Sequence, residues 1–190
     1  MKVNKLLIGG LIIGIGAIMF LNAKIGSKTD TKQATSFTNS ANTNNIVAPK
    51  AVSTGSIAPD FTLTTLDKES FRMSDKKGKT VILFGMAGWC ATCIPEGRAL
   101  TALKREYADK GVEIIGVAFT QGDNDDFLKE YKKIGGIDIP LALDTDNVAQ
   151  KYNLTRLETT YIINKEGKIV YKDEQSTDEK TYKEELDKIL

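Results

Sequence analysis

The sequence predicts an α/β fold in which helices flank a central mixed β-sheet, with a β-hairpin added at the N-terminal side of the domain. Apolar runs at residues 80–86 and 112–119 are typical of strands buried on both faces of a sheet. A helical pattern separates the two runs, so we expect these strands to be parallel. Two further short strands around Glu166 and Gly167 predict an antiparallel edge.

The other elements follow from hydrophobic periodicity and from turn residues. Pro95 lies inside the helix that follows the first core strand, and we expect it to kink the first turns of that helix. Asn124 or Asp123 is expected to cap the next helix, which explains the acidic residues there better than a cation-binding loop. The predicted strands are 61–64, 70–73, 139–143, 161–164 and 168–171, and the predicted helices are 90–110, 125–134, 148–152 and 178–190.

The first 56 residues differ in composition from the rest of the chain. Residues 6–21 are apolar or glycine and follow two lysines, a pattern typical of a membrane anchor or of a secretory signal peptide. We expect residues 1–24 to form an uncleaved signal-anchor, and cleavage after Ala23 is the alternative. Residues 25–56 are rich in Ser, Thr, Asn and Lys, which favours a flexible linker. The folded domain is therefore expected at residues 57–190.

The composition excludes several classes of function. Residues 57–190 contain 20 Lys/Arg and 24 Asp/Glu (net −4) and no basic cluster, which argues against binding to nucleic acid. The chain contains no histidine, so imidazole acid–base catalysis and the usual haem and copper ligands are missing.

The two cysteines of the chain, Cys90 and Cys93, lie three residues apart after the first core strand. In the first turn of a helix, residues at this spacing face one another, so their sulfurs can close a small, reducible ring. Unpaired backbone N–H groups and the helix dipole favour the thiolate, which is the form that attacks disulfides. We interpret Cys90 as the exposed nucleophile and Cys93 as the resolving thiol of a dithiol–disulfide exchanger.

Two other interpretations of the pair are weaker. A zinc site needs about four ligands, and the chain offers neither histidine nor a third cysteine. A purely structural disulfide would close a very short loop and stabilise the fold little. We therefore expect no metal and no cofactor other than the redox-active disulfide itself.

Several further short motifs accompany the cysteine pair in residues 57–190. They are Ala58-Pro59-Asp60-Phe61, Trp89–Cys93, Glu96, Ile139-Pro140-Leu141, Thr159–Ile163 and Lys165–Ile169. With these motifs, residues 57–190 resemble the thioredoxin fold, and more narrowly the membrane-anchored thiol–disulfide oxidoreductases of the TlpA/ResA type. This resemblance implies an extracytoplasmic reductase that receives electrons from a membrane thiol carrier. It also implies protein disulfide substrates, often those in the haem-attachment sites of apocytochrome c.

The resemblance assigns roles to residues around the cysteines. Glu96, one helical turn after Cys93, is implied to move protons for the buried thiol, although an acidic residue there also complements the helix dipole. Trp89 is expected to form an apolar lip beside the nucleophile, with partial core packing as the alternative. Ala91 and Thr92 place no histidine between the cysteines, and this absence favours a reductase over a strong oxidant.

Glu158 is the main departure from the family pattern, which places a cis-proline here, just before Thr159 and facing the disulfide. A cis bond without proline costs about 2.5–4 kcal/mol, so we expect the Leu157–Glu158 bond to be trans and the loop to differ in shape. An inward Glu158 would raise the pKa of the Cys90 thiol, whereas an outward one would be solvated. Glu158 and Thr159 are the expected substrate-binding residues, together with Trp89.

The sequence thus predicts a membrane-tethered thiol–disulfide oxidoreductase, most simply a monomeric protein-disulfide reductase. Its domain is expected on the extracytoplasmic side of a single-pass anchor, or secreted if the signal is cleaved. One alternative is an oxidant or isomerase of disulfides. The other is a metal-binding or redox-sensing module enabled by loss of the cis-proline.

Overall fold

The computed structural model describes residues 52–190. The anchor and most of the linker predicted from the sequence lie outside these residues. Within them, no helix is both long and apolar enough to cross a membrane. The chain joins the domain at the edge of the sheet, where the backbone N–H groups of Gly55 and Ala58 donate to Ile169 and Gly167 at 2.7 and 2.9 Å.

A five-stranded mixed sheet forms the centre of the domain, with strand order β5-β4-β3-β6-β7. Strands β3, β4 and β5 are parallel, and β6 and β7 add the predicted antiparallel edge. A separate two-stranded hairpin, β1–β2, precedes the sheet. The strands are β1 (Thr62–Thr64), β2 (Ser70–Arg72), β3 (Thr80–Met86), β4 (Val112–Ala118), β5 (Leu141–Leu143), β6 (Thr159–Ile163) and β7 (Ile169–Asp173).

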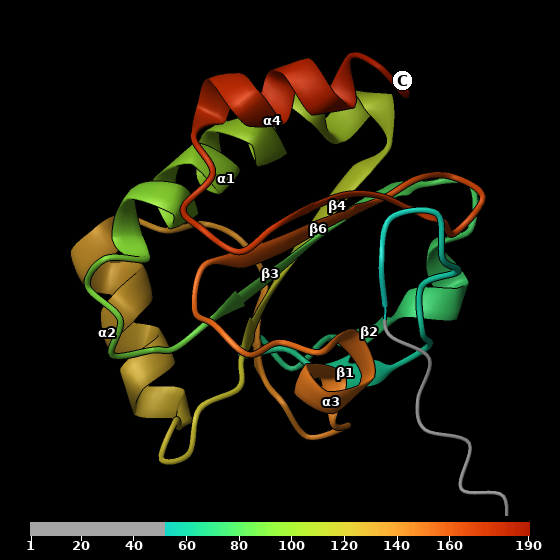
Figure 1. Ribbon diagram of the computed structural model, residues 1–190. Helices are drawn as coiled ribbons and strands as arrows, with labels where there is room; N and C mark the ends of the chain where they lie inside the picture. The colour runs from blue at the N-terminus through green and yellow to red at the C-terminus, as the bar shows by residue number, and fades with distance from the viewer. Residues whose placement is uncertain (1–51) are drawn as a thin grey trace, which may run out of the picture. The chain divides into compact units, whose positions relative to one another are not determined.

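Helices cover both faces of this sheet, with α1, α2 and α4 on one face and α3 with the β1–β2 hairpin on the other (Figure 1). Alternation along β3 explains the two cores. Ile82 and Phe84 join one apolar cluster, whereas Val81 and Leu83 join the other. The helices are α1 (Ile94–Tyr107), α2 (Asp125–Gly135), α3 (Val148–Tyr152) and α4 (Glu179–Leu186), with short 3₁₀ segments at Met73–Lys76 and Ala108–Lys110.

The predicted fold class is confirmed, and one element differs in a way that matters for the site. The helix expected at residues 90–110 begins only at Ile94, because the chain turns through Cys90 and Cys93 occupies the N-cap position. Pro95 therefore stands in the first helical turn, where its missing N–H would have no partner. The loss of an interior i→i−4 hydrogen bond, from which the kink was expected, therefore does not arise at this position.

Candidate active site

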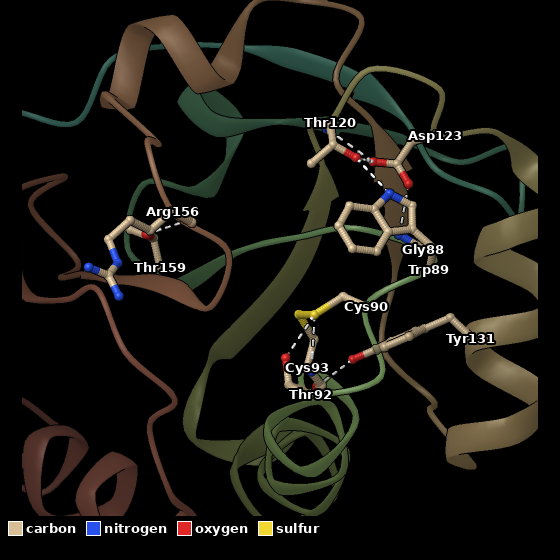
Figure 2. Close-up of a disulfide and its surroundings, with 10 residues drawn as sticks. All are labelled: Gly88, Trp89, Cys90, Thr92, Cys93, Thr120, Asp123, Tyr131, Arg156 and Thr159. Atoms are coloured by element: carbon tan, nitrogen blue, oxygen red, sulfur yellow. Dashed lines mark hydrogen bonds between the residues drawn. A yellow bond between two sulfur atoms is a disulfide. The ribbon is translucent and has the colours of Figure 1, made fainter. Parts of the chain in front are cut away.

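Cys90 and Cys93 form a disulfide at the carboxyl end of β3, with their Cα atoms 5.4 Å apart. The N–H of Cys93 points at Cys90 Sγ, 3.2 Å away, and Thr92 Oγ1 lies 3.3 Å from the same sulfur (Figure 2). Cys90 is only 4% exposed and Cys93 is fully buried. The expectation of an exposed Cys90 was wrong for the disulfide form, in which Cys90 Sγ lies against the backbone N–H of Cys93. Cys90 nevertheless lines a surface groove, and Cys93 does not.

Asp123 fixes the loop that carries the disulfide. Its carboxylate accepts hydrogen bonds from the N–H of Gly88 at 2.8 Å and from the N–H and hydroxyl of Thr120. Asn124, not Asp123, caps α2 by accepting from two backbone N–H groups of its first turn. Both residues were expected as possible caps. The structure shows that Asp123 instead connects the loop between β3 and Cys90 to the loop after β4.

Trp89 forms an exposed lip next to Cys90. Its side chain is 56% exposed, and its indole N–H donates to Thr120 Oγ1 at 3.0 Å, as Figure 2 shows. Partial core packing, the alternative, does not describe this position. The hydrogen bond fixes the direction of the ring, so the lip has a defined shape before any substrate arrives.

Tyr131 on α2 holds the start of α1, a contact that sequence reasoning missed. Its hydroxyl donates to the carbonyl oxygen of Cys93 at 2.7 Å (Figure 2). A Cβ at Gly97 would overlap this hydroxyl, so glycine is required for the approach. Burial and the charges of Glu96 and Glu158 raise the pKa of Tyr131, which keeps the hydroxyl protonated as a donor.

Glu96 is the most unusual charged group of the site, because only 1% of it is exposed. Its Oε1 accepts from Thr160 Oγ1 at 2.8 Å and from the hydroxyl of Tyr182 at 2.6 Å, whereas its Oε2 is buried without a partner. Burial raises the pKa of Glu96 to about 7, against the hydroxyl groups of Tyr182 and Thr160 and the backbone of Thr177, which lower it, and the charge of Glu158 adds to the rise. The carboxyl group can therefore gain or lose a proton near neutral pH.

Glu158 occupies the position where the family pattern has cis-proline, and all described peptide bonds are trans, as predicted. Its φ of 62° lies in the left-handed region, and its N–H donates to Gly85 at 2.9 Å. The side chain is half-buried, and its charge raises the pKa of both Glu96 and Tyr131. Whether the side chain faces Cys90, as in the inward alternative, stays a prediction.

Thr159 starts β6 opposite Gly85 and is fully buried. Its hydroxyl donates to the carbonyl oxygen of Arg156 at 2.7 Å, so the side chain supports the loop from inside (Figure 2). Direct contact of Thr159 with substrate stays a prediction. Among residues 52–190, no group of three or more Cys, Asp or Glu side chains is arranged to hold a metal ion.

Residues 53–190 match the family model described as redoxin. The chain belongs to the redoxin family. It is 35% identical to the thiol-disulfide oxidoreductase ResA of Bacillus subtilis (strain 168) over 122 residues, which are 64% of this chain and 67% of that protein. The thioredoxin-like protein YneN of the same organism is 34% identical over 116 residues, which are 60% of this chain and 68% of YneN.

Solved structures agree with this assignment of the fold. A thioredoxin family thiol:disulfide interchange protein from Chlorobium tepidum TLS superposes with a TM-score of 0.64 at 22% identity, covering 73% of this chain and 98% of that chain. StoA from Bacillus subtilis gives a TM-score of 0.59 at 19% identity, covering 68% and 98%. With the family, the ResA relatives and the Cys90–Cys93 disulfide, this redoxin is a thiol–disulfide oxidoreductase of the thioredoxin-like fold.

The buried carboxyl group of Glu96 predicts a specific pH dependence of stability. Its pKa is 4.5 when unfolded and about 7 when folded, so its contribution to stability is fully present below pH 4.5 and is lost as the pH rises through 7. We expect E96Q, which keeps the acceptor for Thr160 and Tyr182, to remove this loss. Its free energy of unfolding should exceed that of the wild type by about 2–3 kcal/mol at pH 8 and differ little at pH 4.

Denaturant unfolding of the oxidised protein at the two pH values measures this difference. An E96Q protein that loses as much stability as the wild type between pH 4 and pH 8 would show that folding does not raise the pKa of Glu96.

The loop at Glu158 predicts that proline is not tolerated there. Proline cannot adopt a φ of 62° and has no N–H to donate to Gly85. We expect E158P to lower the free energy of unfolding by about 2 kcal/mol or more, since it loses one hydrogen bond and changes the loop. The control E158G removes the same carboxylate but accepts the left-handed φ, and should be within about 1 kcal/mol of the wild type. If E158P is as stable as E158G, the loop can rearrange around proline without cost.

Proposed function

We propose that this protein is a membrane-tethered, extracytoplasmic reductase of protein disulfides, working through Cys90 and Cys93. The observation that carries this proposal is the disulfide at the start of α1 beside the buried carboxyl group of Glu96. The apolar segment at residues 6–21 supports the tether. The ResA relatives support the exchange chemistry, and disulfides of apocytochrome c are the substrate class that the TlpA/ResA resemblance adds.

The reaction consists of two thiol–disulfide exchanges. The Cys90 thiolate attacks one sulfur of the substrate disulfide, which forms a Cys90–substrate bond and releases the other substrate sulfur as a thiolate that takes up a proton. Cys93 then loses its proton, attacks Cys90 Sγ and releases the second substrate thiol. The dithiol is oxidised by two electrons and the substrate disulfide is reduced by two. A dithiol of a membrane carrier returns the protein to its reduced form by the same exchange.

Glu96 is the group that accepts the proton from Cys93 in this scheme. It stands one helical turn after Cys93, its Oε2 is unpartnered, and its pKa is about 7. An acceptor with a pKa near the working pH is the most effective one. Histidine is absent from the chain. A carboxyl group whose pKa is raised by burial therefore takes the role that an imidazole has in other proteins.

The charges around the dithiol support reduction as the direction. A strong oxidant stabilises its own thiolate, and cations beside the nucleophile are one means to that end. Here no Lys or Arg is among the described residues that line the groove at Cys90, and the charge of the half-buried Glu158 acts on Glu96, one helical turn after Cys93. The groove therefore offers no side-chain cation to stabilise the Cys90 thiolate, which agrees with a reductase rather than a strong oxidant.

The reduction potential of the Cys90–Cys93 couple tests this direction. We expect a value near that of thioredoxin, about −270 mV, or lower, measured by equilibration of the full-length protein with a redox buffer. A potential near about −120 mV would make the protein an oxidant of substrate thiols instead.

The exchange mechanism predicts that C93S traps substrates. The mixed disulfide on Cys90 cannot be resolved without the second thiol, so C93S should accumulate disulfide-linked proteins that reducing agent releases. The matched control is C90S, which leaves the fully buried Cys93 as the only thiol and should trap far less. Non-reducing electrophoresis measures both. Equal trapping by the two variants would contradict the assignment of Cys90 as the nucleophile.

A further inference from the structure

A groove of about 260 Å³ runs from Cys90 along α2. We call it the α2 groove. Among the described residues, five large apolar side chains are substantially exposed, and three of these (Trp89, Phe127 and Ile134) line this one groove at 56%, 44% and 61% exposure. Exposed apolar side chains gathered in one concavity mark a binding surface. The full lining is Gly88, Trp89, Cys90, Ala91, Ile94, Phe127, Glu130, Tyr131 and Ile134.

The walls of the α2 groove are held in place by contacts described above and by close packing. A Cβ on Gly88 would come within 2.7 Å of Phe127 Cβ, so the loop before Cys90 rests directly on α2. Trp89 is fixed by its hydrogen bond to Thr120. A groove formed in advance binds with less ordering cost than a surface that must close around its ligand.

The charge of the groove indicates what kind of segment fits. Glu130 is the charged residue among its lining side chains, and no ion pair involves it within residues 52–190. Phe127, Glu130 and Ile134 follow one another at helical spacing, so the carboxylate stands between two apolar side chains along one stripe of α2. A Lys or Arg flanked by apolar residues complements this order.

We propose that the α2 groove binds the part of a substrate protein next to its reactive cysteine, and that this part carries large apolar side chains and a Lys or Arg that meets Glu130. The inference rests on the proposed reductase function. Cys90 itself lines the groove, so a substrate sulfur joined to Cys90 brings its neighbouring residues to the groove's end. The stripe from Phe127 to Ile134 is about 10 Å long, which an extended segment of about three residues spans.

The test compares three disulfides as substrates of the pre-reduced full-length protein. Two are peptides that share the same pair of cysteines and differ beside one of them, with Leu-Lys-Leu in the first and Ser-Glu-Ser in the second. The third is bis(2-hydroxyethyl) disulfide, which has no residues to place in the groove. We expect the second-order rate constant for the Leu-Lys-Leu peptide to exceed that for the Ser-Glu-Ser peptide about tenfold or more.

Variants assign this preference to the groove. F127S and I134S should lower the rate for the Leu-Lys-Leu peptide relative to the small disulfide by about fivefold or more. I57S, which removes another exposed apolar side chain outside the groove, should leave this ratio unchanged. E130K should slow reduction of the Leu-Lys-Leu peptide a few-fold and speed that of a Leu-Glu-Leu peptide by a similar factor.

Several results would overturn the proposal. Equal rates for the two peptides, or a loss in F127S that is the same for all three disulfides, would remove the groove as a substrate site while leaving the reductase function intact. A dimer of the wild-type protein that I134S dissociates in sedimentation would assign the groove to a second copy of this chain. Failure of the wild type to reduce any of the three disulfides would overturn the proposed function as well.

Discussion

The carboxyl group of Glu96 is the point on which the active-site end of this domain depends. A buried ionisable group needs hydrogen-bond partners, and here two hydroxyl groups from distant parts of the chain supply them. Thr160 comes from β6 and Tyr182 from α4, and their own oxygens lie 2.8 Å apart. Because Glu96 stands in the first turn after Cys93, the contacts that hold this carboxyl group also fix where the disulfide sits against the sheet.

The loop before β6, at the same end of the sheet, is stabilised without the cis-proline that the family pattern has at position 158. In this chain Glu158 accepts a left-handed φ, and its N–H closes a hydrogen bond to Gly85 that a proline could not make. The loop thus exchanges the rigidity of a proline ring for a backbone hydrogen bond next to the β3–β6 ladder. Glu158 also adds a half-buried carboxylate whose charge acts on Glu96 and Tyr131, so this residue affects the electrostatics of the site as well as its shape.

The fold and the cysteine pair could be predicted from the sequence, because both depend on local patterns. The apolar run at residues 80–86 gave the bounds of β3, and those of α3 were also correct. The predicted start of α1 was wrong by four residues. The residues at 90–93 suit a turn as well as a first helical turn, so the sequence pattern does not separate the two. Tyr182 and Thr160 were missed because they meet Glu96 across 86 and 64 positions of sequence, and nothing local to a tyrosine in an amphipathic helix indicates such a partner.

Tyr131 contacts both parts of the site: the α2 groove proposed for substrate, and the region of Cys93 and Glu96 proposed for proton transfer. Its ring lines the α2 groove, whereas its hydroxyl holds the carbonyl oxygen of Cys93, the residue from which Glu96 would take a proton. Burial and the charges of Glu96 and Glu158 raise the pKa of Tyr131, so its hydroxyl also responds to the ionisation of Glu96. The proposed substrate groove and the backbone of the resolving cysteine thus share one side chain. Gly97 is what lets this side chain reach the cysteine, because a Cβ there would overlap the hydroxyl of Tyr131.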